Sequence, residues 1–167
     1  KSVPGSRLVL KYMNWYEQAS LRDRLIDQFA AGGIGSERLV FVAILDTINE
    51  HLGHYGEVDI ALDPFPFNGA TTTFQALWMG VPVITLAGET FISRAAGSFL
   101  HQVGLGDLTV NTPKAYVDCA RDLAGNLEQL RTLRANLRER MTASPLCNAP
   151  AYALSVEAAY RDMWGRW

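Results

Sequence analysis

The feature that most constrains the fold is an alternation, along the first two thirds of the chain, of short apolar runs with segments of helical periodicity. Apolar runs at 7–12, 39–45, 60–62, 81–86 and 108–110 predict buried strands. The segments between them place apolar residues at helical spacing. Because strand and helix alternate, we expect a parallel sheet with right-handed crossovers, and hence an α/β, Rossmann-like fold.

Several pairs of residues predict where helices begin. Ser20 with Asp23, and Thr47 with Glu50, have the spacing of capping boxes. Thr112 followed by proline predicts another helix start. From about residue 112 the pattern is helical only, which predicts a C-terminal helical tail. Since 167 residues is the size of one domain, we expect residues 1–167 to form a single domain.

Charge and composition exclude several classes of protein. The net charge of −2 gives no electrostatic reason to expect nucleic acid or an anionic membrane as a partner. No apolar run reaches the length of a transmembrane helix. Cys119 and Cys147 lack the CxxC spacing of zinc and redox sites, and two lone cysteines are typical of a reducing compartment. We therefore expect a cytoplasmic protein with no metal and no other cofactor.

The stretch 67–73, which follows a strand and begins a helix, carries the strongest signal of chemistry. The first N–H groups of a helix have no internal partner, and the helix dipole adds partial positive charge there. Gly69 allows close approach to the backbone, and Thr71, Thr72 and Thr73 add hydroxyl donors. These features are typical of a phosphate site without lysine or metal. An ordinary helix cap with additional threonines is the alternative reading.

Two longer blocks resemble a known family. They are VDIALDPFPFNGATTT at 58–73 and ALWMGVPVITLAGE at 76–89. Together with residues 3–6, 50–52, 93–94, 144–146 and 163–164, they resemble the C-terminal catalytic region of O-linked N-acetylglucosamine transferases and SPINDLY-type proteins, of the bacterial type. The resemblance covers essentially the whole chain.

The resemblance implies a fold, a reaction and a set of contacts. It implies the C-terminal, donor-binding lobe of a GT-B enzyme that transfers N-acetylglucosamine or a related sugar from a UDP-sugar to a protein or peptide Ser or Thr, with inversion and without metal. Thr71 and Thr72 would hold the diphosphate, His51 would lie against the uracil, and Gln75 would face the ribose. The predicted donor site comprises His51, Asn68, Gly69, Ala70, Thr71, Thr72, Thr73 and Gln75. The catalytic residues are not predicted.

The chain departs from the family pattern at three points. Ala70 replaces a histidine of animal members, and Gln75 replaces an acid that faces the ribose. The phosphate-contacting lysine of the family lies upstream of Val3, and the N-terminal catalytic lobe and the tetratricopeptide repeats are expected outside this chain. The chain alone is therefore expected to be inactive. The alternative function, motivated by Ala70 and Gln75, is a non-catalytic scaffold attached to the repeats.

Other polar residues allow competing interpretations. Glu50, His51 and His54 lack the order of a zinc motif. Asp63 could pair with Asp59 as catalytic carboxylates, but we favour a role in capping the proline turn that follows it. Arg94, in the same way, could contact a phosphate or, as we favour, anchor the loop around Glu89.

Overall fold

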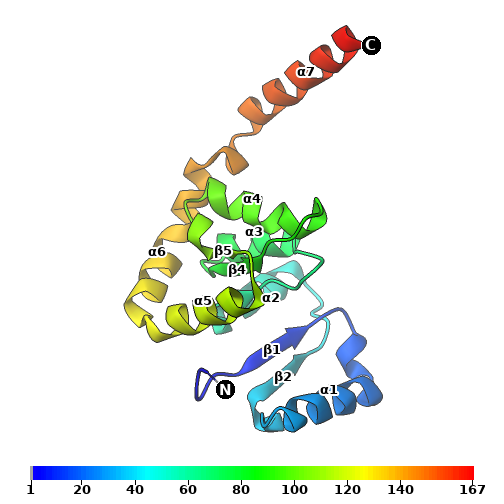
Figure 1. Cartoon of the computed structure of the whole chain (residues 1–167), viewed down its shortest axis with the longest axis vertical. Coiled ribbons are helices and arrows are strands. Elements are labelled where there is room, and N and C mark those ends of the chain that lie inside the picture. The colour runs from blue at the N-terminus through cyan, green and yellow to red at the C-terminus, as the bar shows by residue number, and fades with distance from the viewer. Residues whose placement is uncertain (1) are drawn as a thin grey trace. The chain divides into compact units, whose positions relative to one another are not determined.

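The computed structural model describes residues 2–167, which divide into two compact units. The first unit ends at Val58 and the second runs from Asp59 to Trp167 (Figure 1). Whether the two units form the single domain expected above stays a prediction. Among residues 2–167, no helix is both long enough and apolar enough to span a bilayer.

The first unit contains a two-stranded parallel sheet. Strands β1 (Leu8–Lys11) and β2 (Leu39–Val42) pair over four residues, and α1 (Ala19–Ala31) connects them (Figure 1). Tyr16 packs against Phe41 of β2 at 5.6 Å between ring centroids. The remaining elements are short: η1 (Trp15–Glu17), η2 (Ser36–Arg38), α2 (Ile48–Gly53) and η3 (His54–Glu57).

Two sequence predictions for this unit are wrong. The run 39–45 forms a strand only as far as Val42, because its partner β1 offers four residues of ladder. Residues Ser20 and Asp23 do not form a capping box, since α1 already begins at Ala19 and its cap, Gln18, makes no side-chain bond. The second predicted box is confirmed: the Thr47 hydroxyl accepts from the N–H of Glu50, whose carboxylate accepts from the N–H of Thr47.

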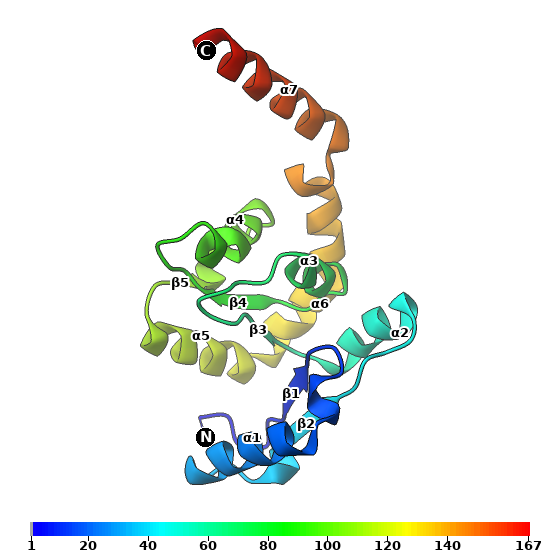
Figure 2. The same cartoon turned by 90° about the vertical axis from the view of Figure 1, so that its right-hand side faces the viewer.

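The second unit is built on a three-stranded parallel sheet in the order β3-β4-β5. The strands are β3 (Ala61–Leu62), β4 (Val83–Leu86) and β5 (Thr109–Val110). Both views show α3 (Thr71–Trp78) and α4 (Ala95–Gln102) on one side of this sheet and α5 (Pro113–Gly125) on the other (Figures 1 and 2). The parallel α/β fold expected from the alternation is thus confirmed.

The core of the second unit lies around β4 and beneath the helices that pack against it. It is made of fully buried aliphatic side chains from α3, β4, the segment between them, α4 and α6 (Leu127–Ala143), namely Leu77, Val81, Ile84, Leu100 and Leu137. The Thr112 cap is confirmed, because its hydroxyl accepts from the N–H of Ala115. Helix α4 begins only at Ala95, because the residues before it form the separate turn η4 (Ile92–Arg94).

The helical tail is confirmed beyond residue 112, and its last helix differs from the others. After η5 (Gly106–Leu108), α5, α6 and η6 (Pro145–Cys147), the chain ends in α7 (Ala149–Arg166). Figures 1 and 2 show α7 extending away from the other elements of its unit. None of its side chains is buried, and Trp164 and Trp167 contact each other with ring centroids 5.9 Å apart. Both tryptophans are exposed, so neither packs against the core of the second unit.

Candidate functional site

The segment that joins β3 to α3, residues 63–70, lies at the carboxyl edge of the second sheet. We call it the β3–α3 loop. In parallel α/β sheets ligands bind beyond this edge, because the loops that follow the strands open there. The backbone of the loop includes a cis peptide bond between Phe65 and Pro66, and both flanking aromatic side chains, Phe65 and Phe67, are exposed.

The helix that follows the loop begins without a side-chain cap. Ala70 is the capping residue of α3 and offers no hydrogen-bond acceptor to the first turn. Among residues 2–167, no protein group accepts from the N–H of Ala70 or of Thr71. Thr71 and Thr72 are exposed beside these amides. The arrangement leaves donors and the positive end of a helix dipole facing outward.

Gly69, by contrast, has both of its backbone polar groups satisfied by the protein. Its N–H donates to Asp63 Oδ1 at 2.7 Å, and its carbonyl accepts from Thr73 Oγ1 at 3.0 Å. Gly69, part of the predicted donor site, therefore has no amide to offer a ligand: the outward-facing set begins one residue later, at Ala70. The side chain of Thr73 is 3% exposed, so its hydroxyl bonds the loop on the buried side.

Asn68 supports the loop from a buried position. Its Nδ2 donates to the carbonyl of Pro64 at 3.2 Å, across the proline turn. Its Oδ1 has no hydrogen-bond partner within residues 2–167. An amide oxygen that is buried without a partner is uncommon, because its desolvation is not compensated. The role of Asn68 as a ligand contact stays a prediction.

Asp63 links the loop to the sheet. The carboxylate is 5% exposed, and while Oδ1 accepts from Gly69, Oδ2 accepts from Thr85 Oγ1 of β4 at 2.6 Å. The main-chain carbonyl of Asp63 accepts from the hydroxyl of Tyr116 at 2.9 Å. The interpretation that Asp63 caps the turn after it is confirmed.

Burial dominates the titration of this cluster. It raises the pKa of Asp63, while the hydrogen bonds from Thr85 and Gly69 act in the opposite direction. Burial, and next the negative charge of Asp63, raise the pKa of Tyr116, so its hydroxyl keeps its proton.

The raised pKa of Asp63 predicts that the protein loses stability as the pH increases. The folded state holds the proton more tightly than the unfolded state. This stabilisation is complete below the ordinary aspartate pKa of about 4 and is lost as pH rises through the folded pKa. In urea denaturation at stepped pH, Asp63→Asn should therefore show a shallower fall than the wild type. Exposed Asp59→Asn should keep the wild-type slope, and an unchanged slope in Asp63→Asn would contradict the assignment.

The remaining predicted residues lie on two helices. Gln75 is half-buried on α3, one turn beyond Thr71. His51 lies in the first unit on α2, where its Nδ1 contacts Lys11 Nζ and its ring meets Tyr55 edge-on at 5.7 Å. Burial lowers the pKa of Lys11. The structure thus brings residues 68–75 together in one unit, while His51 belongs to the other.

Sequence reasoning missed Thr85 and Tyr116, and it chose the wrong side chain in the loop after β4. Thr85 was detectable as a single polar residue within the apolar run 81–86, whereas Tyr116 carries no comparable signal. In the loop after β4, Ser93 holds the turn: its hydroxyl bonds Thr90, and its carbonyl accepts from the N–H of Gly88. Arg94, expected to anchor this loop, is exposed.

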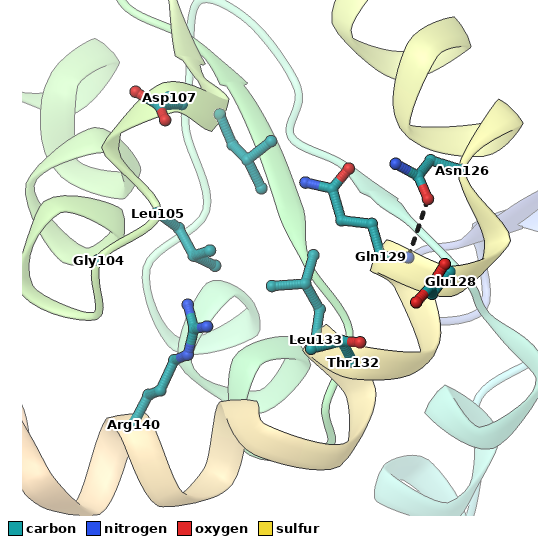
Figure 3. A pocket seen from close by; sticks show the side chains of 10 residues that line it. Gly104, Leu105, Asp107, Asn126, Glu128, Gln129, Thr132, Leu133 and Arg140 are labelled. Carbon is teal, nitrogen blue, oxygen red and sulfur yellow. Dashed lines mark hydrogen bonds between the residues drawn. The ribbon is translucent and has the colours of Figure 1, made fainter.

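A cavity of about 450 Å³ lies elsewhere in the second unit, between the segment that precedes β5 and α6 (Figure 3). Leu105, Leu108 and Leu133 supply its apolar wall, and Arg140 and Gln129 extend toward it. Because η5 precedes β5, this cavity is at the amino edge of the parallel sheet, opposite the β3–α3 loop. None of the predicted site residues lines it.

A parallel α/β unit with an uncapped helix start at its carboxyl edge is an arrangement typical of proteins that hold an anionic group with backbone amides. Comparison with known proteins specifies the class further. The sequence profile of Glycosyl transferase family 41 matches residues 1–156, and the chain belongs to this family.

Relatives of known name agree with this assignment. The chain is 38% identical over 166 residues to the probable UDP-N-acetylglucosamine–peptide N-acetylglucosaminyltransferase SPINDLY of Arabidopsis thaliana, which covers 99% of this chain and 18% of that protein. It is 34% identical over 165 residues to the Arabidopsis protein SEC of the same description, covering 98% and 16%. The chain thus spans less than a fifth of the length of these relatives.

A solved structure shows the same fold. A lysine-to-methionine mutant of the Thermobaculum terrenum O-GlcNAc transferase superposes with a TM-score of 0.86 at 34% sequence identity. The match covers 95% of this chain and 30% of that chain. The expected membership of the O-GlcNAc transferase and SPINDLY group is therefore confirmed, as is the fold class.

Proposed function

We propose that this chain is the donor-binding lobe of a protein O-glycosyltransferase, which transfers N-acetylglucosamine or a related sugar from a UDP-sugar to Ser or Thr. The observation that carries the proposal is the uncapped start of α3, with the hydroxyls of Thr71 and Thr72 beside the outward-facing amides. Membership of family 41 and the donor named in the relatives' descriptions support UDP as the nucleotide.

The proposed chemistry is stabilisation of a leaving group. Negative charge develops on the diphosphate as the glycosidic bond breaks, and backbone donors with a helix dipole stabilise it without reorganising. The reaction so described inverts the sugar and needs no metal or other cofactor, and the UDP-sugar is a substrate. The acceptor base, the N-terminal catalytic lobe and the tetratricopeptide repeats would come from a longer protein that carries this chain.

Titration calorimetry with UDP tests the proposal on the full-length protein. UDP is expected to bind and to raise the melting temperature, because a ligand that binds only the folded state stabilises it. GDP serves as the matched control for recognition of the base. An absence of both heat and thermal shift at saturating UDP would exclude the donor-binding role.

Thr72→Val gives a residue-level prediction. The substitution keeps the shape of the side chain but removes its hydroxyl, so the affinity for UDP should fall by about 1 kcal/mol or more, the scale of a hydrogen bond to a charged group. Thr132→Val, at an exposed position of α6, is the matched control and should leave the affinity unchanged. Equal UDP affinities for Thr72→Val and the wild type would remove this hydroxyl from the site.

A second function is favoured by two substitutions in the site. Ala70 stands where animal members have a histidine, and Gln75 stands where relatives carry an acid, which would suit a non-catalytic scaffold attached to the repeats. The decisive measurement is release of UDP from UDP-N-acetylglucosamine in the presence of a peptide acceptor. Turnover by the full-length protein would exclude the pure scaffold.

The proposed compartment is the cytoplasm. Both cysteines are free, with Cys147 exposed and Cys119 half-buried. Thiols remain reduced in that compartment, and two free cysteines are compatible with it.

A further inference from the structure

We propose that Asp63 is a positioning residue, which helps to direct the Ala70 N–H toward the donor diphosphate by fixing the peptide unit that precedes Gly69, while Thr73 holds the unit that follows it. The inference rests on the proposed function and assigns a role to a carboxylate that does not itself contact the ligand. It concerns a chain of bonds that runs from β4, through Asp63 and Gly69, to the first turn of α3.

The first step is the anchor. Thr85, on the central strand β4, is fully buried and donates its hydroxyl to Asp63 Oδ2. The N–H of Asp63 continues the ladder by donating to the carbonyl of Ile84 at 3.0 Å. The carboxylate is therefore held from the backbone side and from the side-chain side by the most buried strand of the unit. Because the Asp63 side chain is already fixed, it loses little further conformational entropy when it bonds the loop.

The second step fixes Gly69. Oδ1 of Asp63 accepts the Gly69 N–H, and Thr73 Oγ1 donates to the Gly69 carbonyl. The two peptide units that flank Gly69 are thus each held by one hydrogen bond. Because both peptide units are held, the backbone at Gly69 has one orientation toward a ligand.

The third step concerns Ala70. The Gly69 carbonyl and the Ala70 N–H belong to the same peptide unit, which is trans because the cis bond of this loop lies at Phe65–Pro66. In a trans unit the C=O and N–H point in opposite directions. Since the carbonyl points toward Thr73, within the first turn of α3, the Ala70 N–H points away from the helix. It is directed into the space where an anion at the helix start would lie.

The space around Gly69 supports this arrangement. A Cβ at this position would lie 2.7 Å from Thr72 Oγ1, 2.9 Å from Thr73 Oγ1 and 3.2 Å from Asp63 Oδ1. The hydroxyl of Thr72, proposed above to contact the diphosphate, therefore lies beside the same glycine that Asp63 holds. The two bonds at Gly69, one to Asp63 and one from Thr73, thus hold the amide of Ala70 beside the hydroxyl of Thr72.

The test compares UDP with uridine, which lacks the phosphates, on variants of the full-length protein. Asp63→Ala and Thr85→Val should each weaken UDP binding by about tenfold, the effect of misplacing a hydrogen bond to a charged group, and leave uridine binding unchanged. Asp63→Asn should recover most of this loss, because its Oδ1 can accept from Gly69 while its Nδ2 donates to Thr85. The exposed Asp59→Ala is the control and should bind both ligands as the wild type does.

The outcomes separate this inference from the proposed function. A wild type that binds neither UDP nor uridine defeats the proposed function itself. If the wild type binds UDP, then unchanged UDP affinity in Thr85→Val, or an equal loss of UDP and uridine affinity, overturns the positioning role. Should circular dichroism show Asp63→Ala unfolded, Thr85→Val decides alone, because it preserves the volume of the side chain in the core. Selective loss of the phosphate contribution supports the inference.

Discussion

Gly69→Ala is expected to reduce the affinity for UDP by about tenfold or more, a free-energy change of about 1.4 kcal/mol for each factor of ten. The added methyl group would meet the hydroxyls of Thr72 and Thr73 at 2.7 and 2.9 Å, closer than side chains approach. These oxygens lie on Cβ atoms and cannot swing away without rotating a branched side chain that the helix constrains. The methyl group would therefore displace the Thr72 hydroxyl, which the site is proposed to use, and the Thr73 hydroxyl, which holds the Gly69 carbonyl.

The control for this prediction is Gly125→Ala, at the end of α5, where an added Cβ meets no atom within 4 Å. It should leave both UDP affinity and the melting temperature close to those of the wild type. Gly69→Ala should also cost about 1–3 kcal/mol of stability by crowding the loop. Wild-type UDP affinity in a folded Gly69→Ala protein would show that the methyl group is tolerated and that the hydroxyls do not act from their present positions.

The limits of the sequence for the fold are visible at the strand ends. The apolar run 39–45 predicts a strand but cannot reveal the length of its partner, and four paired residues of β1 end the ladder at Val42. Of two helix caps predicted from local spacing, one forms and the other does not. Thr112 is followed by a proline that fixes the entry of the chain, and its cap forms as predicted. Ser20 has the right spacing to Asp23, yet the preceding turn η1 already directs the chain into α1 at Ala19.

The site shows a comparable division between local and long-range information. The pattern at 67–73 predicts a helix start with threonine hydroxyls, and in the structure Thr71 and Thr72 are exposed at this helix start while Thr73 is buried. The identity of the outward-facing amides depends on Asp63, and its hold on the loop depends on Thr85, 22 residues away in the sequence. Tyr116 is 53 residues away from the carbonyl that it bonds. No local pattern specifies partners at such separations, because they meet only when the strands assemble.

The anchor on β4 also gives a physical reason for a carboxylate beside a predicted diphosphate site. A negative charge behind the loop costs desolvation, which is why burial raises the pKa of Asp63. A carboxylate, however, presents two acceptors in one plane, and here one oxygen faces Gly69 while the other faces Thr85. An uncharged side chain of the same size offers one acceptor and one donor. Asp63 can therefore accept from both neighbours at once, at the expense of intrinsic stability.

The largest loss of stability is expected for Gly80→Ala, at about 3 kcal/mol. Gly80 ends α3 with a φ of +81°, and an alanine in this left-handed region costs about 1–2 kcal/mol. The new Cβ would also lie 2.6 Å from the main-chain carbonyl oxygen of Arg134 on α6, and overpacking of this kind adds about 1–3 kcal/mol.

A backbone atom in the middle of α6 cannot rotate aside as a side chain can, so relief of this contact would require α3 and α6 to separate. The two helices are also joined by Arg138 Nε, which donates to the carbonyl of Trp78 at 2.9 Å, one turn along α6. Gly104→Ala measures the cost of the left-handed backbone conformation alone, since Gly104 has a φ of +71° but an added Cβ meets no atom within 4 Å. In urea denaturation it should therefore lose only about 1–2 kcal/mol. Equal losses for the two variants would mean that the approach of α6 to Gly80 contributes nothing to stability, whereas an excess for Gly80→Ala measures the close contact that only a glycine permits.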